Sequence, residues 1–195
     1  MPALPAKPLG YVFGYASLIA DARSLSLPGG EIAPVAGRLH GFRRLWGAAM
    51  NNWEQDEGEK HFVDSGGGEK PRIKVAYLDI EPAEGGTVNG LAIPVDATLL
   101  AAFDAREVNY ERLDVSAAFR PALDAPVLTY RGTAAARARC RPQPGIAVTV
   151  SGEYVRRVRE GFAALGSGQL AEYERTTLPL PFAERELEPR GPGSN

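Results

Sequence analysis

YVFGYASLI, residues 11–19, begins like a buried strand and is then interrupted. Residues 11–13 have the aromatic and β-branched character of a strand, whereas residues 14–17 are small or turn-tolerant. A strand that ends in such a turn leaves backbone N–H groups unpaired and facing outward. These groups can bind water, an anion or a carbonyl oxygen. Residues elsewhere in the sequence must indicate which of these ligands the turn binds.

The composition is that of a globular protein. Of 195 residues, 44% are hydrophobic and 24% are charged, which excludes global disorder and fits one domain, expected over residues 9–187. The net charge of −2 gives no electrostatic footprint for nucleic acid, and no apolar run approaches the roughly 20 residues of a membrane span. We expect neither partner. The oligomeric state stays open.

Three segments are expected to lie outside the packed core. Residues 1–8 are predicted to be a flexible lead-in without the apolar core of a secretory signal. Residues 188–195 are too rich in Pro and Gly to pack. The stretch 54–72, charged and then Gly-rich, is predicted to be a mobile surface loop between two strands.

Short strands dominate the rest of the chain. The pattern predicts them at 9–14, 32–39, 42–49, 73–80, 87–95, 110–118 and 126–131. These elements predict an α+β fold, a small mixed β-barrel with flanking helices, because closing the sheet protects strand edges. A flat, open antiparallel sheet with two flanking helices is the alternative.

Two segments have apolar residues at helical spacing. They are 96–107, with Asp96 placed to cap its N-terminus, and 151–166, with Ser151 as the expected cap and Gly166 as the expected end.

The sequence lacks the residues for a catalytic triad, a zinc site or a common nucleotide-binding motif. The two histidines are poorly placed for a catalytic triad, because His61 lies in the charged insert and His40 lies within a predicted strand. No Cys or His pair has the spacing of zinc ligands, and no nucleotide-binding glycine motif occurs. The single cysteine, Cys140, fits a reducing cytoplasm. We therefore expect no metal and no cofactor, and carboxylates and tyrosines as the reactive groups.

The densest group of candidates is FDAREVNYERLDVS, residues 103–116. Glu107 and Tyr110 lie there at a boundary between helix and strand, where side chains can line a cleft. Composition and spacing do not choose Glu107 over Asp104 or Glu111, and a solvated helix end with local ion pairs is the alternative for each carboxylate.

Two motifs together resemble the γ-glutamylcyclotransferase superfamily, which includes the ChaC-like and AIG2-like proteins. YVFGYASL at 11–18 resembles the family's loop after its first strand, and FDAREVNYERLDV at 103–115 resembles the context of its glutamate. Segments 35–46, 87–107 and 151–166 agree with the family in order and spacing. The likeness covers roughly residues 9–180.

The resemblance implies a role for seven residues. The substrate-cradling loop would be Tyr15, Ala16, Ser17 and Leu18, the general acid/base Glu107, and the pocket-lining hydrogen-bond donors Tyr110 and Tyr154. From the sequence alone, Tyr154 lies on an apolar helix stripe, which favours a core aromatic over a site residue, and a plain half-buried strand residue is the alternative for Tyr110. The family usually has Gly where this chain has Ala16, which would be strained if that position requires φ > 0.

The implied reaction converts a γ-glutamyl compound into 5-oxoproline and a free amine or amino acid. The leaving group could belong to a γ-glutamyl amino acid, glutathione, a γ-glutamyl amine or a protected biosynthetic intermediate. Its pocket would be built by loops such as 54–72. A binding or regulatory module that keeps the pocket without reacting is the alternative function, and a scaffold protein is a third.

Overall fold

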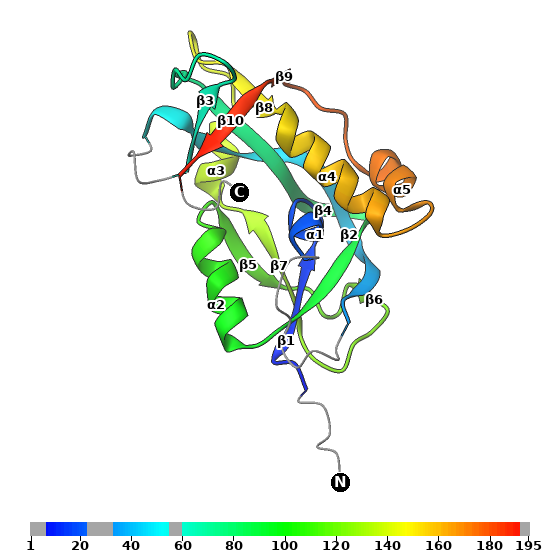
Figure 1. Ribbon diagram of the computed structural model, residues 1–195. Helices are drawn as coiled ribbons and strands as arrows, with labels where there is room; N and C mark the ends of the chain where they lie inside the picture. The colour runs from blue at the N-terminus through cyan, green and yellow to red at the C-terminus, as the bar shows by residue number, and fades with distance from the viewer. Residues whose placement is uncertain (1–6, 23–32, 55–59, 192–195) are drawn as a thin grey trace.

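The structure, a computed structural model, describes residues 7–22, 33–54 and 60–191 (Figure 1). The strands are β1 Gly10–Gly14, β2 Val35–Asn51, β3 His61–Asp64, β4 Lys74–Val95, β5 Tyr110–Asp114, β6 Phe119–Arg120, β7 Val127–Gly132, β8 Val148–Ser151, β9 Ala183–Arg185 and β10 Leu187–Arg190. The helices are α1 Leu18–Asp21, α2 Ala97–Arg106, α3 Ala134–Arg139, α4 Gly152–Ala164 and α5 Gln169–Thr176, with a 3-10 turn at Asn52–Glu54. The parts of the predicted tails and loop at 1–6, 55–59 and 192–195 lie outside the described residues.

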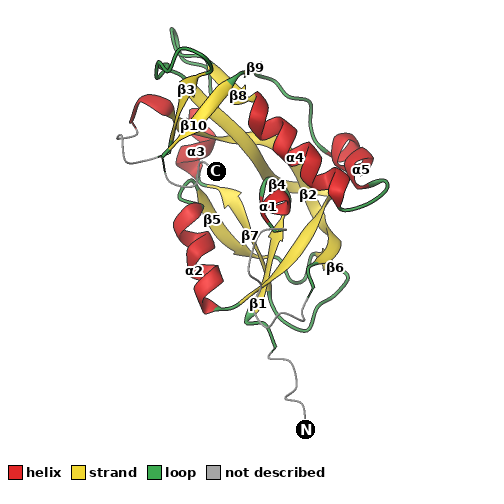
Figure 2. Ribbon diagram, viewed as in Figure 1, coloured by secondary structure: helices red, strands yellow, loops and turns green. Residues whose placement is uncertain are grey.

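The main sheet has eight strands and curls into a half-barrel (Figure 2). Its path is β5-β7-β1-β4-β2-β6, with β8 joined to β4 and β9 joined to β8. The β1–β7, β4–β8 and β8–β9 pairs are parallel, and the others are antiparallel. The predicted mixed α+β class is therefore confirmed, and the flat antiparallel alternative is wrong.

Two pairs of predicted strands are in fact two long strands. β2 joins 32–39 to 42–49, and β4 joins 73–80 to 87–95, because each runs antiparallel to the other on both sides of the predicted break. The register shifts between His40 and Phe42, where Gly41 has a φ of +79°. The extra residues of this irregularity lie in β4, where residues 83–86 stand opposite Gly41 alone, and the pairing continues on both sides of it.

The predicted loop and C-terminal tail are wrong for seven residues, which form strands. β3, within 54–72, pairs antiparallel with β10, which extends into 188–195. The pair forms because Phe62 and Leu187 bury their side chains in a second small core with Met50, Ile73 and Val75. The fully buried Asn52 fixes this core, since its amide nitrogen donates to the Phe62 carbonyl and its amide oxygen accepts from the Phe62 N–H.

The predicted strand at 110–118 ends early. β5 stops at Asp114, because the carboxylate of that residue accepts hydrogen bonds from the N–H and the hydroxyl of Ser116 and so forms a turn. The strands at 9–14 and 126–131 appear as β1 and β7.

Both predicted helices form. The carboxylate of Asp96 accepts from the Leu99 N–H at 2.8 Å and caps α2 as expected. Gly166, with φ of +117°, follows the last turn of α4. The predicted side-chain cap at Ser151 is wrong, because its hydroxyl donates to the Leu187 carbonyl at 3.5 Å instead. The sequence pattern did not reveal α1, α3 or α5.

Helices α4 and α5 pack side by side against the sheet (Figure 1). The Phe162 and Tyr173 rings of α4 and α5 stack with centroids 4.5 Å apart. The fully buried guanidinium of Arg44 in β2 lies 4.9 Å from both ring centroids and donates to Thr177 and to Asn89. This cation therefore ties α4, α5 and the sheet together.

β1 and β4 approach each other most closely where β1 ends. A Cβ atom on Gly90 would lie 2.3 Å from the Gly14 carbonyl oxygen and 2.7 Å from the ring of Phe13. Only a residue without a side chain allows β4 to pass this close to the turn at 14–17.

Replacement of Gly90 by Ala should lower the free energy of unfolding by about 1–3 kcal/mol, because the new methyl group overlaps backbone atoms that cannot move aside. Denaturant titration of the purified protein measures the loss. Gly67→Ala is the matched control, since its Cβ would meet no atom within 4 Å and its φ is not positive. Equal stability of the two variants would contradict the close approach of the strands.

Candidate functional site

The interruption after β1 is a turn that leads into α1. Residues 15–17 link the two elements, and the Ala16 carbonyl accepts from the Ile19 N–H at 3.1 Å. Among the described residues, no backbone carbonyl accepts from the N–H groups of residues 15–18. The turn therefore presents backbone donors, as its sequence suggested.

The side chains of this turn have other roles. Tyr15 is buried, and its hydroxyl donates to the Tyr130 carbonyl at 2.7 Å, so it anchors the turn to β7. Leu18 packs into the core. No described residue other than glycine has a positive φ, so Ala16 carries none of the strain that a left-handed conformation would impose. Tyr15 and Leu18 can thus offer a ligand their main chain only.

Glu107 is held at the C-terminal end of α2. Its N–H donates to the Phe103 carbonyl at 2.9 Å, and its carbonyl accepts from the Tyr110 N–H at 2.8 Å. Its side chain is 16% exposed. Burial raises the pKa of this carboxyl group above the ordinary value of 4.5, while the charges of Arg106 and Lys60 oppose the rise. Glu107 is thus a largely buried carboxylate with a raised proton affinity.

The other two candidate carboxylates lie elsewhere. Asp104 accepts from the Tyr130 hydroxyl at 2.7 Å and pairs with Arg112, and its side chain is 42% exposed. Glu111 pairs with Arg131 at 2.5 Å on the surface. The structure therefore separates Glu107 from its neighbours, which the spacing in the sequence did not.

Tyrosines surround Glu107. The Tyr110 hydroxyl donates to the Leu78 carbonyl at 2.9 Å, and the Tyr154 hydroxyl accepts from the Leu78 N–H at 3.4 Å. Burial raises the pKa of Tyr15, Tyr110 and Tyr154, and the nearby charge of Glu107 adds to each rise. The fold thus brings the turn after β1, the end of α2 and the start of α4 to one place on β4.

An ion-pair cluster next to this group was not foreseen. Asp21 of α1 is buried, and its carboxylate pairs with Arg106 of α2 at 2.5 Å and with Arg157 of α4. The pKa of Glu107 is also raised by the negative charge of Asp21. The three residues lie in separate helices, and no local sequence signal links them.

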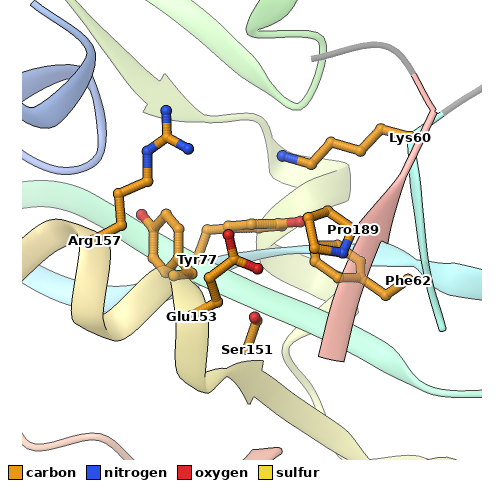
Figure 3. A pocket seen from close by; sticks show the side chains of 8 residues that line it. Lys60, Phe62, Tyr77, Ser151, Glu153, Arg157 and Pro189 are labelled. Carbon is orange, nitrogen blue, oxygen red and sulfur yellow. The ribbon is translucent and has the colours of Figure 1, made fainter. Parts of the chain in front are cut away.

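A cavity of about 50 Å³ lies between the start of α4 and the β3–β10 pair (Figure 3). It is lined by Lys60, Phe62, Tyr77, Ser151, Glu153, Tyr154, Arg157 and Pro189. Three of these, Lys60, Tyr77 and Tyr154, lie close enough for the charge of Glu107 to shift their pKa. Tyr154 lines the cavity, as expected from the resemblance. Tyr110 does not, because its hydroxyl is turned to the Leu78 carbonyl.

Two further searches concern other kinds of site. Within residues 7–22, 33–54 and 60–191, no group of three or more His, Cys, Asp and Glu side chains could hold a metal ion. No helix in the same ranges is long and apolar enough to cross a membrane.

No protein-family model matches the sequence, and no curated protein matches it. Solved structures do match. A γ-glutamyl cyclotransferase has 15% identity and a TM-score of 0.52, with 86% of this chain and 85% of that chain covered. The chain has a γ-glutamyl cyclotransferase-like fold. This result confirms the fold that the two motifs implied.

Two further structures share this γ-glutamyl cyclotransferase-like fold. An uncharacterized human protein has 14% identity and a TM-score of 0.53, over 91% of this chain and 92% of that chain. YkqA from Bacillus subtilis has 18% identity and a TM-score of 0.53. The similarity covers 87% of this chain and 54% of that chain. At these identities the similarity establishes the fold alone.

Replacement of Glu107 by Gln should stabilise the protein relative to the wild type as the pH rises. The raised pKa means that the folded state binds this proton more tightly than the unfolded state does. The bound proton therefore contributes to the free energy of unfolding. This contribution is complete below the pKa of Glu107 in the unfolded state, and it is lost as the pH rises through the pKa of Glu107 in the folded state, because a charge must then be buried. Gln carries no charge, so the difference should grow as the pH rises above about 4 and level off once Glu107 is ionised in the folded state.

Denaturant titrations of both proteins across this pH range measure the difference. Glu111→Gln serves as the control, because Glu111 is a surface residue in an ion pair. A difference that stays constant with pH would show that Glu107 ionises like an exposed glutamate, and a wild type that gains on the variant would show a lowered pKa; either result would contradict the raised pKa.

Proposed function

We propose that the protein is a γ-glutamylcyclotransferase-like enzyme, which releases 5-oxoproline and an amine or amino acid from a γ-glutamyl compound by intramolecular aminolysis. One observation carries the proposal. Glu107, 16% exposed and with a raised pKa, lies in a γ-glutamyl cyclotransferase-like fold, where its charge acts on Lys60, Tyr77 and Tyr154 in the cavity wall. A partly desolvated carboxyl group of this kind suits proton transfer near neutral pH.

The substrate supplies its own nucleophile. In a γ-glutamyl compound the α-amino group and the γ-carbonyl carbon belong to one molecule and close a five-membered ring. Well-oriented intramolecular reactions reach effective molarities of about 10⁵ M or more. The enzyme therefore needs a base, donors for the oxyanion and a surface that holds the substrate folded.

Glu107 would act first as base and then as acid. As a carboxylate it takes one proton from the α-ammonium group, and the freed nitrogen attacks the γ-carbonyl carbon. The bond from that carbon to the departing nitrogen then breaks, and protonated Glu107 donates its proton to that nitrogen. The lactam nitrogen keeps one of its three original protons, and the other two leave with the released ammonium ion.

The turn after β1 would supply the anion site. Its N–H groups at residues 15–18 are backbone donors that can bind the substrate carboxylate or the tetrahedral oxyanion. Tyr154 would contact the substrate from the cavity wall. Tyr110 would act indirectly, since its hydroxyl donates to the Leu78 carbonyl while the Tyr154 hydroxyl accepts from the Leu78 N–H, so that both rings are held by one residue of β4.

Glu107→Gln should abolish release of 5-oxoproline, with a loss of about 10²–10⁴-fold for a general acid/base. The measurement incubates the purified chain with γ-glutamyl amino acids, glutathione and γ-glutamyl amines, and quantifies 5-oxoproline by mass spectrometry. Glu111→Gln, which alters a surface carboxylate of the same segment, should retain activity.

Two outcomes would count against the proposal. Full turnover by Glu107→Gln would show that another group moves the proton. Absence of turnover by folded wild-type protein, with γ-glutamyl compounds still bound, would favour a binding module that keeps the pocket. A cytoplasmic location and a role in glutathione metabolism belong to the proposal in the same way, and the preferred substrate tests the second of these.

A further inference from the structure

The cavity at the start of α4 is closed by residues that do not belong to the main sheet. Lys60 and Phe62 come from the start of β3, and Pro189 comes from β10. The ion pair of Arg185 with Asp64, 2.6 Å long, joins the segment before β10 to the end of β3. The two-stranded sheet thus forms one wall of the cavity, opposite α4 (Figure 3).

Two cations reach into this cavity from opposite walls. The Arg157 guanidinium from α4 and the Lys60 ammonium from the β3 side extend toward each other (Figure 3). Arg157 is already paired with Asp21. Lys60 pairs with no carboxylate among the described residues, and its ammonium nitrogen lies 5.8 Å and 5.9 Å from the ring centroids of Phe62 and Tyr77.

This environment holds Lys60 ready for an anion. Partial desolvation and the nearby positive charge of Arg106 lower the pKa of Lys60, and the negative charge of Glu107 offsets this only in part, although the residue as a whole is exposed at the cavity rim. Glu153 also lines the cavity, but it forms no ion pair with Lys60. A carboxylate entering between Lys60 and Arg157 would supply the missing counter-charge.

We propose that Lys60 determines specificity by binding a carboxylate on the leaving group of the substrate. This inference rests on the proposed function, and it narrows the substrate to γ-glutamyl amino acids or peptides over γ-glutamyl amines. In the proposed function the glutamyl half has its own donors in the turn at 15–18, between β1 and α1, whereas Lys60 lies beside the β3–β10 pair. A second anion-binding group suits a substrate with a second carboxylate.

Two probes that differ by one carboxylate test the inference. They are γ-L-glutamyl-L-alanine and γ-L-glutamylethylamide, whose binding is measured by calorimetry to full-length Glu107→Gln, so that turnover does not interfere. We expect γ-glutamylalanine to bind about tenfold or more tightly, as a charge-assisted hydrogen bond provides. Adding Lys60→Met should remove that advantage and leave the affinity for the ethylamide unchanged.

Three controls define the result. Lys60→Arg keeps the charge and should retain most of the preference. Lys70→Met removes an exposed lysine from the same segment and should change neither affinity. If Lys60→Met lowers the affinity for both probes equally, Lys60 contacts the glutamyl half and the inference is overturned. Unchanged affinity for both probes would overturn it as well.

The failure of this inference differs from failure of the proposed function. Turnover of γ-glutamyl compounds without any dependence on Lys60 would overturn the carboxylate site alone. A Lys60-dependent preference in binding, with no release of 5-oxoproline by the wild type, would overturn the reaction alone.

Discussion

The long antiparallel pairing of β2 with β4 is the constraint on which the rest of the structure depends. It runs from the Val35–Ala92 pair to the Asn51–Lys74 pair and stays intact through two register shifts. β4 carries Leu78, whose backbone groups engage both Tyr110 and Tyr154, and Gly90, which lets β1 pass close by. Residues that are far apart in the sequence reach Glu107 because this one ladder holds them in register.

Buried charged side chains fix the positions of the elements around the β2–β4 pair. The carboxylate of Asp79, fully buried in β4, accepts from the N–H groups of Ile80 and Gly132 and pairs with Arg137 of α3 at 2.8 Å. Arg44 holds α4 and α5 from β2, and burial lowers its pKa to about 10. Each of these groups would be costly to bury alone, so each element must dock where its partners are. The charges thereby restrict how the helices can sit on the sheet.

The sequence predicted strands and helices best where local chemistry decides them. Asp96 caps α2 through its own neighbouring N–H groups, and β1 and β7 follow short hydrophobic runs. Prediction failed where distant partners decide: β3 lies in a charged, Gly-rich stretch, and it forms only because β10, more than a hundred residues later, pairs with it. Gly41 looked like the end of a strand, because a bulge and a turn use the same residue type.

The sequence by itself determined the α+β class, the γ-glutamylcyclotransferase resemblance and the short set of candidate groups, since composition, capping and motif order are local properties. Only the tertiary structure separated Glu107 from Asp104 and Glu111, because burial, which raises its proton affinity, depends on what packs over the end of α2. The same holds for Lys60. Its place in the cavity follows from the pairing of β3 with β10, a contact that no local pattern in the sequence encodes.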